Sequence, residues 1–267
     1  MILSSSFLAF SAKDGLKNWE EIVKDLTQVK FRRADRFSHA VLSGAISCLN
    51  QHQLKEFALY FGASNGSLES VKNSQDNIFL QNRFPLPFAF INTLSGTPLF
   101  FLLQYLNMQT PAISTAHSHF AFENALSLAL IDFKQKRIKN ALIGVCDVWY
   151  EPLEQSRKKF DCEAHEFSAW VFMEHNAKDC VNFFSNFEKL LKFIKQFEAN
   201  PFYISPDFPK KEYDELKKIV QICPNNAVKT ITNSSASVIC EHFAHTKTPL
   251  FYIGYDSIGG YSFVNIN

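Results

Sequence analysis

The sequence has no excess of charge of either sign, because 27 lysine and arginine residues stand against 26 aspartate and glutamate residues, a formal net charge of +1. A chain with this balance has no overall field that would attract nucleic acid or an anionic membrane surface. It also has no apolar run that approaches the roughly 20 residues of a membrane-spanning helix. We therefore expect no nucleic-acid partner and no membrane span.

Paired cysteines and a secretory signal are also missing. The first residues, Met1-Ile2-Leu3-Ser4, lack a basic region and are interrupted by serine, which is not typical of a signal peptide. The cysteines are dispersed and contain no C-x-x-C pair. This pattern predicts a reduced, cytoplasmic protein and not a disulfide framework. The six cysteines are Cys48, Cys146, Cys162, Cys180, Cys223 and Cys240.

The composition is that of a globular protein, with 46% apolar and 20% charged residues. A chain of 267 residues can bury a large core as one domain or as two fused half-domains. Phenylalanine is unusually frequent, at 28 residues, and is scattered along the chain. We interpret it as filling of the core, and some of these side chains as candidates for the lining of an apolar channel.

The first two thirds of the chain alternate between expected strands and helices. The helix expected over 120–136 is apolar nearly all round, which is typical of a central helix packed on several sides. Asp35 is the expected N-cap of a helix that runs to about Asn50. Strands are expected at 3–11, 57–63, 112–116, 141–146 and 167–174, further helices at 67–73 and 96–106, and a short helix or loop at 14–26.

The last third repeats this alternation in a shorter form. Residues 177–198 carry Lys and Phe at helical spacing and are expected to form a connecting helix. Strands are then expected at 202–204, 228–232, 250–253 and 261–266, and helices at 210–221 and 235–244. Alternating strands and helices of this kind predict mixed or parallel sheets covered by helices, arranged as two halves of one pseudo-duplicated fold.

Several short motifs follow one another in an informative order. Residues 114–119 read Ser-Thr-Ala-His-Ser-His between an expected strand and the central helix. Residues 32–37 read Arg-Arg-Ala-Asp-Arg-Phe, and residues 90–94 read Phe-Ile-Asn-Thr-Leu with Asn92 and Thr93. Residues 255–262 read Tyr-Asp-Ser-Ile-Gly-Gly-Tyr-Ser, and 142–147 read Leu-Ile-Gly-Val-Cys-Asp.

In this order the motifs resemble those of the β-ketoacyl synthases of the thiolase superfamily, most specifically over residues 31–174. The resemblance implies a layered αβαβα fold of two pseudo-duplicated halves. It assigns residues 1–175 to the first half, 176–198 to the connecting helix and 199–267 to an abbreviated second half. Members of this fold usually dimerise through the strand before the nucleophile, here at about 110–115. Met108, Pro111, Ala112 and Ile113 are the expected core of that interface.

The departures from the synthases are as informative as the matches. Where the synthases carry the nucleophilic cysteine of Thr-Ala-Cys, this chain has His117, and neither segment that supplies the two catalytic histidines has a match. The resemblance therefore implies an inactive subunit similar to a chain-length factor, whose C-terminal turn is closer to 255–262. Its partner would be an active synthase or a second copy, with an acyl carrier protein as a further candidate. The pathway would make a fatty acid, polyketide or aryl polyene, and no cofactor is expected.

The site expected from the resemblance is centred on His117. Acyl-imidazoles are labile and a helix N-terminus disfavours imidazolium, so we expect His117 to be a buried, neutral side chain that fills the vacated site. The backbone N–H groups of His117 and Ile258 are the candidates for a surviving oxyanion hole. Gly259 and Gly260 either belong to that hole or serve a tight turn. The complete candidate binding set is His117, His119, Asn92, Thr93, Ile258, Gly259 and Gly260.

Two other functions stay open on the sequence alone. One is an acyl-thioester transferase or hydrolase that uses His117, with His119 as its base. The other is a non-enzymatic binding protein derived from the thiolase fold. Cys240-x-His242-x-x-His245 and Cys162-x-x-His165 contain metal-ligand types, but their spacing favours surface histidines, and no metal is expected. Arg32, Arg33 and Arg36 fit either an acidic carrier protein or capping and ion pairs.

Overall fold

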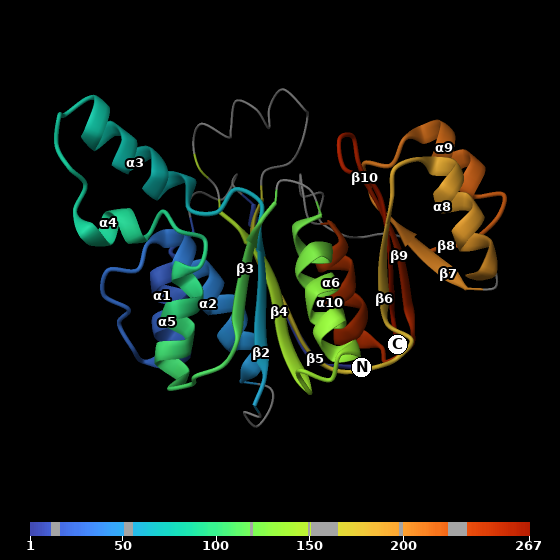
Figure 1. Ribbon diagram of the computed structural model, residues 1–267, viewed down its shortest axis with the longest axis horizontal. Helices are drawn as coiled ribbons and strands as arrows, with labels where there is room; N and C mark the ends of the chain where they lie inside the picture. The colour runs from blue at the N-terminus through green and yellow to red at the C-terminus, as the bar shows by residue number, and fades with distance from the viewer. Residues whose placement is uncertain are drawn as a thin grey trace.

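The chain folds into five layers in the order helix, sheet, helix, sheet, helix (Figure 1). The computed structural model describes residues 1–11, 17–50, 56–117, 120–148, 150, 165–197, 200–223 and 234–267. The predicted αβαβα architecture is confirmed. None of the helices in these ranges is long and apolar enough to cross a membrane.

The first sheet has the strand order β1-β5-β4-β2-β3. β2 (Ala58–Ala63), β3 (Ala112–Ala116) and β4 (Asn140–Asp147) run parallel, and β5 (His165–Glu174) is antiparallel to both β4 and β1 (Ile2–Ser11). β2 and β4 are buried along their whole length. Helices cover both faces of the sheet, which is why these strands read in the sequence as continuous apolar runs.

The second sheet repeats the same pattern with shorter strands, in the order β6-β10-β9-β7-β8. β7 (Pro201–Ile204) pairs in parallel with β8 (Gln221–Ile222) and β9 (Leu250–Asp256), whereas β10 (Gly260–Ile266) is antiparallel to β9 and to β6 (Cys180–Phe184). The two sheets therefore share one topology, which supports pseudo-duplication. The strand predicted at 228–232 lies outside the described residues.

The connecting helix predicted over 176–198 is wrong in its first part. That segment begins with strand β6, which pairs with β10, and only then enters α8 (Phe187–Ile194) and the short 3-10 helix η2 (Lys195–Phe197). Along β6, Cys180 and Phe184 pack against the core between the second sheet and its outer helices. Val181 packs against the core around α6. This period of two is the strand pattern, and the helical spacing of Lys and Phe belongs to the residues after it.

Three layers of helices flank and separate the sheets (Figure 1). The first layer holds α1 (Trp19–Thr27), α2 (Arg36–Leu49) and α5 (Thr97–Leu106); the middle layer holds α6 (Ala121–Lys134) and α10 (Ser234–His245); the last holds α8 and α9 (Lys210–Leu216). Asp35 caps α2 as predicted, because its carboxylate accepts the N–H of Ser38 at 2.8 Å. α3 (Leu68–Phe79) and α4 (Pro87–Ile91) project from the body as an arm.

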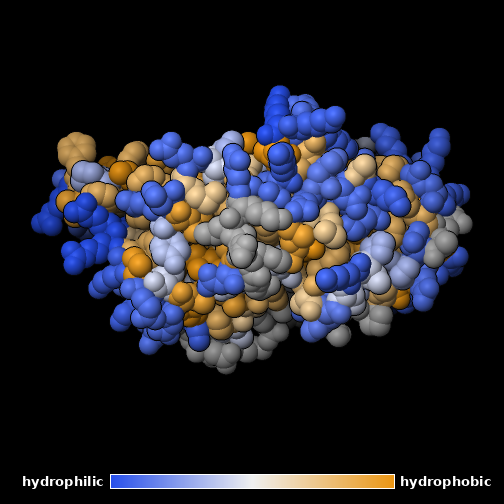
Figure 2. Space-filling model, turned by 90° about the horizontal axis from the view of Figure 1, so that it is seen from below, coloured by the Kyte–Doolittle hydropathy of each residue, from blue (hydrophilic) through white to orange (hydrophobic). Residues whose placement is uncertain are grey.

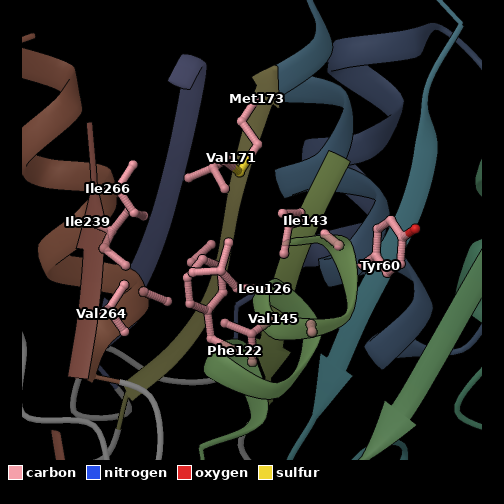
Figure 3. Packing of buried hydrophobic residues seen from close by; sticks show 14 of the residues in the cluster. Tyr60, Phe122, Leu126, Ile143, Val145, Val171, Met173, Ile239, Val264 and Ile266 are labelled. Carbon is pink, nitrogen blue, oxygen red and sulfur yellow. The ribbon is translucent and has the colours of Figure 1, made fainter. Parts of the chain in front are cut away.

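The inner core surrounds α6, as the sequence predicts for its central helix. Figure 3 shows Phe122 and Leu126 of α6 between strand residues of the first sheet and Ile239, Val264 and Ile266 of the second half. The exposed Ile131 of α6 is an exception near the end of the helix. Burial from both sides makes α6 the element that joins the two halves.

Phenylalanine fills the smaller outer core of the second half, as expected from its frequency. The rings of Phe193 and Phe197 lie 5.2 and 5.1 Å from that of Phe263, and Phe197 and Phe202 each lie 5.6 Å from Phe251. Large rings bury much apolar area per residue, which suits a half with short strands. Other phenylalanines are exposed, however, and these gather on the arm.

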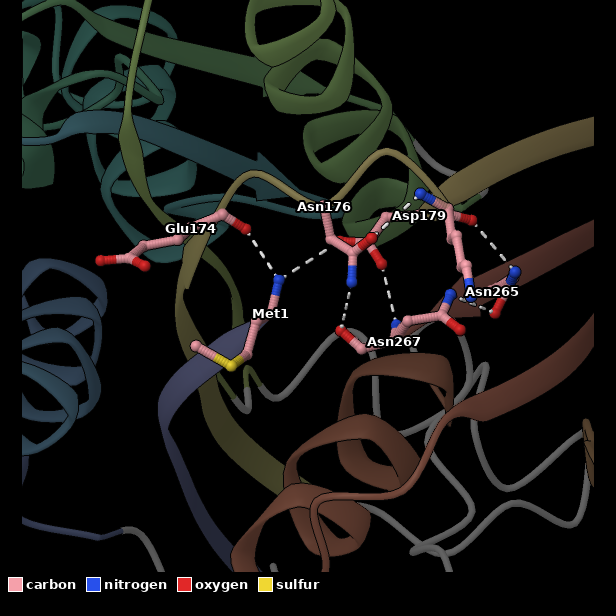
Figure 4. Close-up of polar contacts among 7 residues, drawn as sticks. Met1, Glu174, Asn176, Asp179, Asn265 and Asn267 are labelled. Carbon is pink, nitrogen blue, oxygen red and sulfur yellow. Dashed lines mark hydrogen bonds and ion pairs between the residues drawn. The ribbon is translucent and has the colours of Figure 1, made fainter.

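Polar contacts hold the segment between the two halves (Figure 4). The amino group of Met1 donates to the carbonyl of Glu174 at 2.8 Å and lies 3.5 Å from a carboxylate oxygen of Asp179. The other oxygen of Asp179 accepts the N–H of Asn267 at 2.8 Å, and Asn265 donates to the carbonyl of Lys178 at 3.1 Å. The first and last strands thus fix the crossing from β5 to β6.

A close approach between β2 and the start of α6 depends on Gly62. A Cβ atom placed there would lie 2.2 Å from the carbonyl oxygen and 2.6 Å from the carbonyl carbon of Ala121. These are backbone atoms and cannot rotate away. Gly62 is therefore required for the helix to pack this closely on the sheet.

We expect Gly62→Ala to lower the free energy of unfolding by about 1–3 kcal/mol, because the new methyl group would push α6 away from β2. For a chain of this size each kcal/mol corresponds to roughly 2–4 °C in thermal midpoint. Gly96→Ala is the matched control, since nothing lies within 4 Å of a Cβ there, and its effect should stay within about 0.5 kcal/mol. Equal midpoints for the two variants would contradict the argument.

Candidate functional site

The candidate site lies where the parallel strands of the first sheet end. The carboxyl ends of parallel strands meet at one edge of a sheet, and this edge is the usual ligand site of α/β folds. β3 ends at Ala116, and the N–H of His117 still donates to the carbonyl of Ala63 at the end of β2, at 2.9 Å. α6 begins at Ala121. His117 thus lies between the end of β3 and the start of α6, in the strand-to-helix connection where it was predicted.

The turn is closed by a backbone conformation that a bulky side chain rarely adopts. Phe120 has φ 51° and ψ 41°, in the left-handed region. Its side chain is buried, and its ring lies 5.8 Å from that of Phe183 on β6. Such a conformation costs on the order of 1–3 kcal/mol and persists only where the surrounding packing imposes it. The turn is therefore held by contacts with the second half.

The expectation that His117 is a buried plug is wrong, because its side chain is exposed. β3 is an edge strand with β2 as its neighbour, and most of its residues are exposed or half-buried. A residue that follows such a strand lies at the border of the sheet and not in the core. Ser118 and His119 lie outside the described residues, so the role of His119 as a base remains a prediction.

The glycine-rich turn between β9 and β10 is built around Asp256. Its carboxylate accepts the N–H groups of Ile258 and Gly259, each at 2.8 Å, while the side chain of Ile258 is 81% exposed. Gly260 has φ +83°, and a Cβ there would lie 2.6 Å from the carbonyl oxygen of Phe184. The paired glycines therefore serve a tight hairpin turn, which was the alternative to an oxyanion hole.

Both N–H groups proposed for the oxyanion hole are engaged within the protein. That of His117 donates to Ala63, and that of Ile258 donates to the carboxylate of Asp256. An oxyanion would have to displace a carbonyl from the first and a carboxylate from the second. Catalysis by an oxyanion hole requires donors that are already free and aimed at the reacting oxygen.

Asn92 and Thr93 make contacts that hold the arm to the body. The side-chain amide of Asn92 donates to the carbonyl of Arg33 at 2.8 Å, and the main-chain carbonyl of Asn92 accepts the hydroxyl of Ser67 at the start of α3. Thr93 donates to the carbonyl of Phe90 at 2.7 Å. The structure thus gives these two predicted binding residues a role in fixing α3 and α4.

The arginine motif also has structural partners. Arg36 forms an ion pair with the buried Glu166, which accepts the indole N–H of Trp19 at 2.9 Å. The guanidinium of Arg33 lies 4.0 Å from the ring centre of Phe88 on the arm. Of the two interpretations of this motif, ion pairing therefore accounts for Arg36.

The metal-ligand types at the C-terminal helix have other partners. His242 makes contacts through both ring nitrogens, with the hydroxyl of Tyr203 at 3.3 Å and the carbonyl of Thr248 at 2.8 Å. Within the ranges that the structure describes, no three His, Cys, Asp or Glu side chains come together as a metal site. Cys162 lies outside those ranges.

Two polar features near the site were not predicted. Asn65, just beyond β2, donates to both carboxylate oxygens of Asp147 at 3.2 and 3.1 Å, and Asp147 is buried at the end of β4. Glu123, in the first turn of α6, is 2% exposed. Burial raises the pKa of its carboxyl group to about 7. An acid in the first turn of a largely apolar central helix was the signal in the sequence that could have revealed Glu123.

The assembled site offers an exposed imidazole at a strand-to-helix turn, engaged backbone donors and a buried acid behind the turn. A decarboxylative condensation needs a thiolate that holds the acyl chain as a thioester. Position 117 carries no thiol, so this geometry does not supply that step.

No protein-family profile matches the sequence, and no curated protein matches it. Solved structures do match. The ishigamide ketosynthase/chain length factor aligns with a TM-score of 0.66 at 10% identity, covering 91% of this chain and 84% of that one. The complex of a ketosynthase with its chain length factor from Xenorhabdus doucetiae aligns at 0.62 and 12% identity, covering 100% and 98%.

A type II polyketide ketosynthase in complex with its acyl-carrier protein aligns with a TM-score of 0.69 at 12% identity, covering 99% of this chain and 97% of that one. At such identities the likeness establishes the fold and not the activity. The chain therefore has the thiolase-like fold of the ketosynthases and resembles their chain-length-factor subunits.

Proposed function

We propose that this chain is a catalytically inactive subunit, similar to a chain-length factor, that pairs with an active β-ketoacyl synthase and helps to shape its acyl channel. The observation that carries the proposal is an open sheet edge beside a large exposed apolar surface, next to a site without a nucleophile. The decisive experiment is co-expression with a synthase, as detailed below.

The open edge belongs to β3. It pairs with β2 on one side, and the sheet order ends with it. An edge strand presents a row of N–H and C=O groups that can pair with a strand of another chain. Ile113, the second residue of β3, is 37% exposed. An edge of this kind suits a partner that contributes its own edge strand.

The apolar surface lies on the arm and the neighbouring α5. Figure 2 shows apolar atoms at the end of the molecule that carries α3 and α4. Phe84 is 97% exposed, and Phe79, Leu80 and Leu86 are each about three-quarters exposed. Exposed apolar patches of this extent mark interaction sites in soluble proteins. The other exposed members of this surface are Ile78, Phe88, Phe90, Ile91, Leu94 and Phe100.

The arm does not use these side chains to pack on its own body. α3 buries Ser74 alone among its residues, and α4 buries none. The arm is attached through polar bonds instead, such as that from Ser70 to Asp35 at 2.7 Å. A groove lined by Phe100, Leu103, Gln104, Asn107, Met108, Gln109, Thr110 and Pro111 continues from α5 to the start of β3. The groove, arm and edge together are a candidate for the 1,000 Å² or more that a stable interface needs.

The comparisons support this assignment. The titles of the matching structures describe a ketosynthase with its chain length factor and a ketosynthase with an acyl-carrier protein. In the first of these, the alignment covers 98% of the matching chain. We infer an acyl carrier protein as the source of the substrate, and fatty-acid, polyketide or aryl-polyene synthesis as the pathway type.

The five cysteines within the described residues are all free thiols, with Cys48, Cys146 and Cys240 buried. Free buried thiols suit a reducing compartment. This supports the cytoplasm as the place where the two subunits would assemble.

We expect the purified chain not to condense malonyl and acyl thioesters, because position 117 has no thiol. His117→Cys should remain inactive, since the two catalytic histidine segments are also missing from the sequence. Mass spectrometry of the products and an assay for released free thiol would measure condensation by the wild-type chain and by His117→Cys. Carbon–carbon bond formation lost in His117→Ala would refute the proposal, whereas thioester hydrolysis lost in that variant would favour the transferase or hydrolase alternative.

We expect Ile113→Asp to weaken association with the synthase by about 2 kcal/mol or more, roughly 30-fold, because it places an unpaired charge in the interface. Size-exclusion chromatography of the co-expressed pair, followed by a titration, would measure this. Val29→Asp is the control, since Val29 is 41% exposed and follows α1, away from the β3 edge. The partner hypothesis would be contradicted if the chain stayed monomeric in the presence of the synthase. It would also be contradicted if the two variants weakened association equally.

Phe84→Ser tests the arm separately from the edge strand. Because Phe84 is 97% exposed, the substitution should leave the thermal midpoint of the isolated chain unchanged while association falls by roughly tenfold or more. Phe84→Leu should keep most of the affinity. If Phe84→Ser bound the synthase as tightly as the wild type, the arm would not be part of the interface.

A further inference from the structure

A buried polar cluster lies where the two halves meet, behind the turn that carries His117. Glu123 comes from the first turn of α6, Ser235 from the first turn of α10, and Ser262 from β10. All three are at most 2% exposed. The hydroxyl of Ser262 lies 3.3 Å from one carboxyl oxygen of Glu123. The cluster therefore joins both central helices to the second sheet.

The cluster is incompletely satisfied. The other carboxyl oxygen of Glu123 and the hydroxyl of Ser235 have no hydrogen-bond partner within standard distances among the described residues. The packing is tight on the side of Ser262, since a Cβ placed on Gly254 would lie 3.3 Å from the first carboxyl oxygen of Glu123 and 2.2 Å from the hydroxyl of Ser262. A charge held here would lack water, and burying an uncompensated carboxylate is costly.

Among the residues that the structure describes, no charged group is a main influence on the carboxyl group of Glu123. Its pKa is raised by burial, and this is opposed by its own backbone N–H and by the hydroxyls of Ser235 and Ser262. The titratable groups on the neighbouring elements are not among the main influences on this pKa. They are His117 after β3, Tyr60 on β2, Cys146 and Asp147 on β4, Cys180 on β6, Cys240, Glu241, His242 and His245 on α10, and Tyr252 on β9.

We propose that Glu123 is a proton-operated latch: protonated, it closes the contact between α6, α10 and β10, and ionised, it loosens that contact. A protonated carboxyl can donate one hydrogen bond and accept others, which suits a neighbourhood of serine hydroxyls. The carboxylate can only accept, and it gains from solvation that the closed cluster does not provide. The latch does not depend on the proposed partner.

The direction of the pH effect follows from the two pKa values. The ordinary value is 4.5 and the folded value is about 7. The contribution of Glu123 to the closed state is therefore complete below pH 4.5 and is lost as the pH rises through about 7. If opening restores the ordinary value, the opening equilibrium should rise about tenfold between pH 6 and pH 8.5.

Hydrogen–deuterium exchange of the full chain at pH 6 and pH 8.5, corrected for intrinsic rates, tests the latch. We expect about tenfold lower protection at pH 8.5 in peptides that cover residues 120–130 and 254–264. Peptides over α8 should not change. Glu123→Gln should show the same protection at both pH values, because the amide keeps the shape without a titrating proton.

Glu215→Gln is the matched control, since Glu215 is exposed on α9, and it should keep the tenfold effect. A wild-type chain without pH dependence, or the same dependence in Glu123→Gln, would overturn the latch. If Glu123→Gln does not fold, NMR titration of glutamate carboxyl carbons in the wild type decides. One carboxyl titrating near pH 7 supports the latch, whereas titration of every glutamate below about pH 5.5 refutes it.

Discussion

The packing of α6 between the two sheets is the constraint on which the other features depend. Ala121, Ala125 and Ala129 are fully buried, and Gly62 lets the carbonyl of Ala121 approach the backbone of β2. Small residues at these positions allow helix and sheet to come close. The same helix starts four residues after His117 and carries Glu123, so its position sets the site turn, the buried cluster and the spacing of the halves.

The outer surfaces of the two halves differ in a way that bears on assembly. The outer helices of the second half cover a core of packed phenylalanine rings. In the first half, β3 is left at the sheet edge and the arm turns its large apolar side chains to solvent. Apolar area left exposed lowers solubility and returns no stability to the isolated chain, so its retention is best explained by a partner.

The proposed function separates the scaffold of this fold from its chemistry. The strand-to-helix turn persists at His117, held by the left-handed Phe120 and its contact with Phe183, although the residue at the turn is an imidazole. The donors that an oxyanion would need are engaged by Ala63 and Asp256. What remains at the junction is a buried carboxyl group, whose ionisation is governed by desolvation.

The sequence by itself predicted sheets covered by helices, because the continuous apolar runs at β2 and β4 and the largely apolar α6 are local features of the chain. The five-layer order was what the resemblance to the β-ketoacyl synthases implied. The sequence also located the turn at His117 and the cap at Asp35. Only the tertiary structure decided that β6 is a strand, that His117 is exposed, that Asn92 holds the arm and that Glu123 faces Ser262. These depend on which segments meet in the fold, and contacts between residues 59 to 139 positions apart leave no local pattern in the chain.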